Sequence, residues 1–88
     1  MKLNTLISNI MAATKDQWRL LKRCCDNEVP VFVLTGTDRC AMAALHAYME
    51  EAVRLGCDPV FLADLRGNVI PDFETFQKEE QEKVKLPD

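Results

Sequence analysis

The side chains best suited to metal binding or nucleophilic chemistry in this sequence are Cys24, Cys25, Cys40, His46 and Cys57. No two cysteines form a C-x-x-C pair, and a zinc site would need these residues to converge from separate elements. The spacing therefore predicts neither metal ligands nor a cofactor. Polar residues interrupt the apolar N-terminal segment, so it does not predict a secretory signal. We expect reduced thiols in a cytoplasmic protein.

His46 and Glu50 are a second pair of residues that could take part in catalysis. They lie four residues apart and would share one helical face. An imidazole beside a carboxylate can act as an acid–base pair. No nucleophile or third partner stands at a readable spacing beside them, so a solvated surface pair explains them better. The sequence predicts no catalytic residues, and we expect a protein that is not an enzyme.

The loop Thr35-Gly36-Thr37-Asp38-Arg39 is where a ligand site could lie. A glycine-containing turn between a strand and a helix N-terminus can hold an anion on backbone N–H groups, and Arg39 could pair a carboxylate or phosphate. However, the loop has one glycine and no Lys-Ser/Thr pair, and Asp38 would repel phosphate. Asp38 is better explained as a carboxylate at the helix start. The ligand-binding candidates are Thr35, Gly36, Thr37 and Arg39.

The hydrophobic pattern of residues 1–88 predicts a single small α+β domain that is mostly helical. Apolar residues recur at intervals of three and four between residues 3 and 25, which predicts a long N-terminal helix. Residues 29–34 form an apolar run broken only by Pro30, which is typical of one short buried strand. Residues 77–88 are almost entirely polar and predict a helical or frayed tail.

A second long helix is predicted over residues 38–55, with Gly56 as its left-handed C-terminal cap. Two shorter C-terminal helices follow. The first begins after the capping residue Asp58 and ends at Gly67, and the second begins at Pro71 after a turn. The predicted buried stripe of the second long helix consists of Ala41, Ala44, Leu45, Tyr48, Met49, Ala52 and Val53.

The strand predicted at 29–34 has no convincing partner in its own chain, although buried backbone groups must be paired. The alternatives are a short segment around residues 67–70 and the same strand of a second copy across a two-fold axis. A chain of 88 residues builds a thin core, and 48% of these residues are hydrophobic. We therefore expect a homo-oligomer, with a dimer favoured, and allow for a further protein partner.

The charge distribution is uneven along the chain. Residues 1–25 carry five basic groups and one acidic group, whereas residues 26–88 carry six basic and thirteen acidic groups. The basic segment could contact nucleic acid, but a net charge of −3 makes charge complementarity within or between copies the better explanation. No apolar run is long enough to span a membrane. The candidate interaction residues are Trp18, Arg19, Lys22 and Tyr48; the nucleic-acid alternative would use Lys15, Arg19, Lys22 and Arg23.

The run Pro30-Val31-Phe32-Val33-Leu34, followed by Gly36, Asp38 and Ala41, resembles a strand–loop–helix segment written PVFVLxGxDxxA. A loosely defined group of small phage- and prophage-type bacterial proteins of unknown function shares this segment. The resemblance covers only this part of the chain, and it departs after Asp38, where the group commonly has an Ala-Pro step. It implies a bacterial or phage setting and supplies no activity.

The sequence therefore predicts, first, a non-enzymatic accessory or interaction protein that associates with itself. The alternative is a binder of a small anionic metabolite or nucleotide that uses the loop Thr35 to Arg39. The third hypothesis is nucleic-acid contact through the basic first helix.

Overall fold

The computed structural model describes residues 17–87. The chain divides into two compact units, Met1–Val33 and Leu34–Asp88, and each is described by itself. The prediction of one domain over residues 1–88 stays a prediction.

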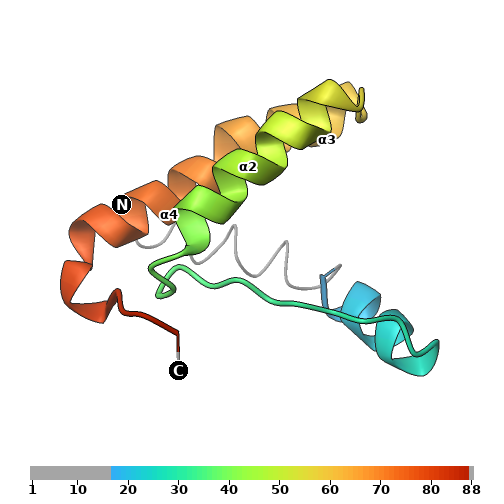
Figure 1. The fold of residues 1–88 in the computed structure, drawn as a ribbon, viewed down its shortest axis with the longest axis horizontal. Helices are drawn as coiled ribbons and strands as arrows, with labels where there is room; N and C mark the ends of the chain where they lie inside the picture. Colours follow the sequence, from blue (N-terminus) through green and yellow to red (C-terminus); the bar gives the residue numbers. More distant parts are fainter. Residues whose placement is uncertain (1–16, 88) are drawn as a thin grey trace. The chain divides into compact units, whose positions relative to one another are not determined.

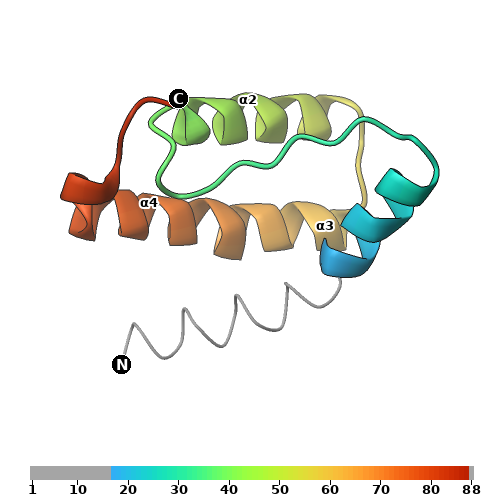
Figure 2. The same cartoon turned by 90° about the horizontal axis from the view of Figure 1, so that it is seen from below.

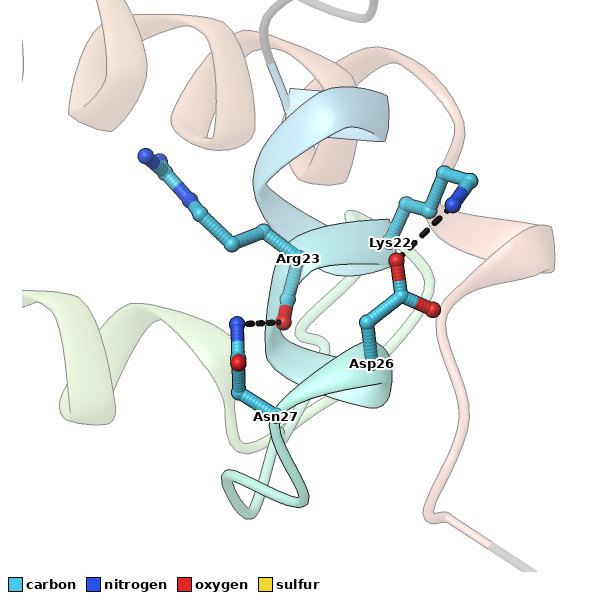
Figure 3. Close-up of polar contacts among 4 residues, drawn as sticks. All are labelled: Lys22, Arg23, Asp26 and Asn27. Atoms are coloured by element: carbon cyan, nitrogen blue, oxygen red, sulfur yellow. Dashed lines mark hydrogen bonds and ion pairs between the residues drawn. The ribbon is translucent and has the colours of Figure 1, made fainter.

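In the first unit, residues 17–26 form a helix with exposed polar side chains (Figure 3). Lys22 Nζ and Asp26 Oδ2 form an ion pair at 2.8 Å, one helical turn apart. Asn27 Nδ2 donates to the Arg23 carbonyl at 2.8 Å, and the Asn27 backbone N–H donates to the same oxygen. Pairs of this kind on an exposed helix contribute about 0.2–0.5 kcal/mol each, so they support the helix without fixing it.

This helix ends with a Schellman motif centred on Glu28. The Val29 N–H donates to the Cys24 carbonyl at 2.8 Å, and the Glu28 N–H donates to the Cys25 carbonyl at 3.3 Å. The motif requires a left-handed residue, and Glu28 takes that position with φ of 56°. Because a side chain strains this conformation, the helix end stores a local cost that a glycine would not carry.

The second unit is a helical hairpin (Figures 1 and 2). Helix α2 (Ala41–Arg54) runs in one direction and packs against α3 (Pro59–Asp64) and α4 (Ile70–Glu79), which return alongside it. A π-helical segment, η1 (Leu65–Val69), joins α3 to α4, and a 3-10 turn, η2 (Gln81–Lys83), follows α4.

The turn between α2 and α3 has the capping residues that the sequence predicts. Gly56 has φ of 71°, and the N–H groups of Gly56 and Cys57 donate back to Val53 and Ala52. Asp58 then accepts from the Val60 N–H at 2.7 Å, with Pro59 in the first turn of α3. The predictions of a left-handed glycine cap and a capping aspartate are confirmed.

The interior of the described chain is small. Its buried apolar residues are Ala41, Ala52, Leu65 and Ile70. Two of them belong to α2 and are alanines, so α2 and the returning helices meet along a narrow seam with little side-chain volume inside it. The prediction of a buried stripe on this helix is wrong at Ala44, Tyr48 and Val53, which are exposed.

The fold-class prediction of an α+β protein is wrong. Residues 29–34 do not form a strand. The isolated β-bridge found in the described chain joins Asp38 to Lys85, outside those residues. A β-branched run favours extended backbone, but a strand also needs a neighbouring strand to bond. The described chain is helical instead.

Two helix predictions also need correction. The long N-terminal helix over 3–25 is not seen: the described helix covers 17–26, and residues 3–16 lie outside the described residues. The predicted break at Gly67 is a π turn, in which the Ile70 N–H donates to the Leu65 carbonyl. Pro71 has no N–H to donate the next hydrogen bond of an α-helix. The wider π turn lies directly before Pro71, so the chain continues as a helix through this position.

Glu28→Gly should raise the free energy of unfolding of the first unit by about 1 kcal/mol, because glycine adopts positive φ without a Cβ penalty. Hydrogen exchange at the Val29 N–H, measured by NMR, reports this helix end directly and should slow. Glu28→Ala is the matched control, since it removes the carboxylate but keeps the Cβ. Equal slowing in both variants would mean that the backbone conformation at Glu28 is not the cause.

Candidate functional site

The candidate ligand loop, Thr35 to Arg39, lies directly before α2 and is fixed by residues distant in sequence. Gln77 of α4 is the central one. Its Nε2 donates to the Gly36 carbonyl at 3.1 Å and to the Asp38 carbonyl at 2.8 Å. A glutamine amide nitrogen carries two hydrogens, so one side chain can satisfy both carbonyls. These bonds hold the loop against α4.

Gly36 is needed here because the loop approaches α4 closely. A Cβ on Gly36 would lie 3.0 Å from Cδ1 and 3.3 Å from Cγ of the Phe76 ring. The aromatic ring and the neighbouring Gln77 amide therefore contact the same stretch of loop backbone. The sequence predicted that the loop would depend on Gly36. In the structure, the missing Cβ of Gly36 lets the loop pack closely against the Phe76 ring.

The C-terminal segment provides the third attachment. The Lys85 N–H donates to the Thr37 carbonyl at 2.9 Å, and the Arg39 N–H donates to the Lys85 carbonyl at 2.9 Å. The two bonds form a parallel bridge between Asp38 and Lys85. Lys85, in the polar segment 77–88, is thereby bonded to the loop.

Asp38 organises the entry into α2. Its Oδ1 accepts from the Cys40 N–H at 2.7 Å, and its carbonyl accepts from the Ala41 N–H at 3.0 Å. The prediction that this carboxylate caps the helix is wrong: Cys40 holds the N-cap position of α2 without a side-chain cap bond, and the Asp38 carboxylate bonds the N–H of Cys40, before the first turn. The hydroxyls of Thr35 and Thr37 share a hydrogen bond at 2.9 Å.

These contacts bear on what the loop can bind. The N–H groups of Asp38, Arg39, Cys40 and Ala41 all donate to oxygens of the chain itself. An anion held on those groups would have to displace bonds that the loop already makes. The candidate residues Thr35, Gly36, Thr37 and Arg39 do lie together, with Arg39 exposed, and anion binding there stays a prediction.

The predicted interaction residues lie on both units. In the first unit, the Trp18 side chain is 69% exposed, Arg19 is exposed and Lys22 pairs with Asp26. In the second unit, Tyr48 is 56% exposed and its ring meets that of Phe61 edge-on, with centroids 6.2 Å apart. Both units thus present an aromatic side chain to the solvent.

The residues considered for metal or thiol chemistry are dispersed. Cys24 and Cys57 are half-buried, Cys25 and Cys40 are exposed, and all are free thiols. Residues 17–87 contain no group of three or more His, Cys, Asp or Glu side chains placed to hold a metal ion. Over the same residues, no helix combines the length and the apolar character that crossing a bilayer requires.

A hydrogen bond to its own backbone lowers the pKa of the Glu82 carboxyl, and a hydrogen bond with the Glu80 side chain lowers it further. Glu82 belongs to η2 and is exposed, so the shift reflects local turn geometry at the surface.

Sequence reasoning did not identify Phe76, Gln77 or Lys85 as part of the loop. A signal for Gln77 was present: Ile70, Phe73 and Gln77 lie at helical intervals of three and four, so the amide belongs to the apolar face of α4. A polar residue on such a face needs a partner, and carbonyls of a neighbouring loop supply one. The hydrogen bonds that the Lys85 backbone makes correspond to no comparable pattern in the sequence.

The comparisons with known proteins give no family for this chain. No family model matches it, and no curated protein or solved structure does so either.

Gln77→Leu should lower the free energy of unfolding of the second unit by about 1–3 kcal/mol. The leucine keeps the side-chain volume but removes the side-chain donor of the Gly36 carbonyl and leaves the Asp38 carbonyl with the Ala41 N–H alone. Urea unfolding followed by circular dichroism measures the change. Gln81→Leu, at an exposed position of η2, is the matched control and should change stability by less than about 0.5 kcal/mol. Equal effects of the two substitutions would show that the hydrogen bonds of Gln77 do not stabilise the loop.

Proposed function

We propose that this chain is a non-enzymatic interaction protein that associates with itself through apolar side chains of the unit Leu34–Asp88. The observation that carries the proposal is the contrast between its small interior and the large side chains left outside. Complete burial of a Leu or Phe side chain is worth about 1.5–3 kcal/mol, and the buried set contains two residues of comparable size, Leu65 and Ile70.

The unit Leu34–Asp88 carries half of the exposed large hydrophobic residues of the described chain, and the other half lie between residues 18 and 33. In this unit the large hydrophobic residues with exposed side chains are Tyr48, Val53, Leu55, Val60, Phe61 and Leu86. All but Leu86 belong to α2, to the turn after it or to α3. Large apolar side chains left on the surface of a small protein favour association where they form a patch.

The biological setting follows from the sequence resemblance. We place the protein in a phage- or prophage-type bacterial context, in the cytoplasm, as an accessory factor whose assembled form presents its surface to a further protein partner. Anion binding at the loop and nucleic-acid contact at the basic helix remain the alternatives.

A dimer should give a mass of about twice the 10.0 kDa of one chain by light scattering at micromolar protein concentration. Because association stabilises the folded state by mass action, the thermal midpoint should rise with protein concentration. Sedimentation velocity separates one defined species from polydisperse aggregation. A mass of one chain, with a thermal midpoint independent of concentration, would reject self-association.

A further inference from the structure

A short segment after η2, residues 84–87, is bonded to the loop that leads into α2, and we call it the strap. Val84 has extended backbone, with φ of −85° and ψ of 125°. Lys85 donates its N–H to the Thr37 carbonyl and accepts from the Arg39 N–H, both at 2.9 Å. These two bonds make a parallel bridge between the strap and the loop.

The strap buries little of its side-chain surface. Lys85, Leu86 and Pro87 are exposed, and Val84 is half-buried. Little apolar surface therefore leaves the solvent when the strap bonds to the loop. Segments with few buried apolar contacts open at a lower free energy than the helices of the same fold. We therefore expect the strap to open more readily than the hairpin unfolds.

The loop is also held by α4, through contacts that do not involve the strap. Gln77 donates to the carbonyls of Gly36 and Asp38. The Phe76 ring lies against Gly36, at the closest distance that a residue without a Cβ permits. Because Phe76 and Gln77 belong to α4, the loop would stay attached to the hairpin after the strap opened.

Opening of the strap changes the bonding of one N–H group at the start of α2. The N–H of Arg39 donates to the Lys85 carbonyl, whereas the other N–H groups of residues 38–41 donate to oxygens of the loop itself. Release of the strap therefore frees the Arg39 N–H and the Thr37 carbonyl, and it leaves the other bonds in place.

We propose that the strap is a latch, which opens and closes while the hairpin stays folded and controls access to the loop backbone at Thr37 and Arg39. In the closed state Lys85 occupies both groups. In the open state the two groups are free to bond water or another extended backbone. The latch acts within one chain, so it is independent of the proposed self-association.

Amide hydrogen exchange, measured by NMR on the full-length chain, tests the latch. The N–H groups of Lys85 and Arg39 should have protection factors that agree within about threefold, because one opening exposes both. Met49, in the middle of α2, should be protected at least about tenfold more strongly. Equal protection at all three positions would mean that the strap opens only when the hairpin unfolds. Unequal protection of Lys85 and Arg39 would mean that they do not share one opening. Either result would overturn the proposal.

Lys85→Pro should open the latch selectively. Proline has no N–H to donate to Thr37, and the extended backbone of Val84 is compatible with a proline after it. Protection at Arg39 should fall at least about tenfold, while protection at Met49 should change less than about twofold. Lys85→Ala is the matched control, since it removes the ammonium group and keeps the backbone bonds. It should leave protection at Arg39 within about twofold.

Three results with these variants would also overturn the proposal. Loss of helical circular dichroism or of protection at Met49 in Lys85→Pro would show that the hairpin cannot fold without the strap. Unchanged protection at Arg39 would show that the bond to Lys85 does not cover this N–H. An equal fall in Lys85→Ala would assign the effect to the lysine side chain.

Discussion

The constraint on which the second unit depends is the small volume of the seam between α2 and the helices that return along it. Ala41 and Ala52 are almost fully buried, and each has one methyl group to remove from water. At roughly 25 cal/mol per Å² of apolar surface, such contacts stabilise a helix pair weakly. The hairpin therefore relies on interactions at its ends: the Gly56 and Asp58 caps at the turn, and Gln77 and Lys85 at the open end.

The features that the sequence could predict are those that depend on residues close to each other in the chain. The caps of the hairpin turn and the existence of α2 depend on residues within one or two helical turns of each other, and those features were predicted. Pairing of residues 29–34 depended on a second strand that the sequence never located, and the strand prediction was wrong. The Gln77 and Lys85 contacts join segments about 40 residues apart or more, where no short-range pattern fixes the partner.

The loop before α2 shows why a local motif does not define a site. A glycine-containing turn leading into a helix can present N–H groups to an anion, or it can use them within the chain. The choice depends on where those N–H groups donate. Here the N–H groups of residues 38–41 donate to the loop itself and to Lys85, while Gln77 donates to two carbonyls of the loop. The loop is a junction that joins three segments of the unit.

The position of Tyr48 bears on how folding and the proposed self-association are related. Tyr48 lies four residues before the buried Ala52 and seven after the buried Ala41, so its exposed ring stands beside the apolar layer of the seam. One aromatic pair, Tyr48 with Phe61, already reaches from α2 to α3 at the edge of that layer. The proposed self-association would enlarge this small core instead of building a separate interface. For so short a chain, this is a physically economical route to a stable helical fold.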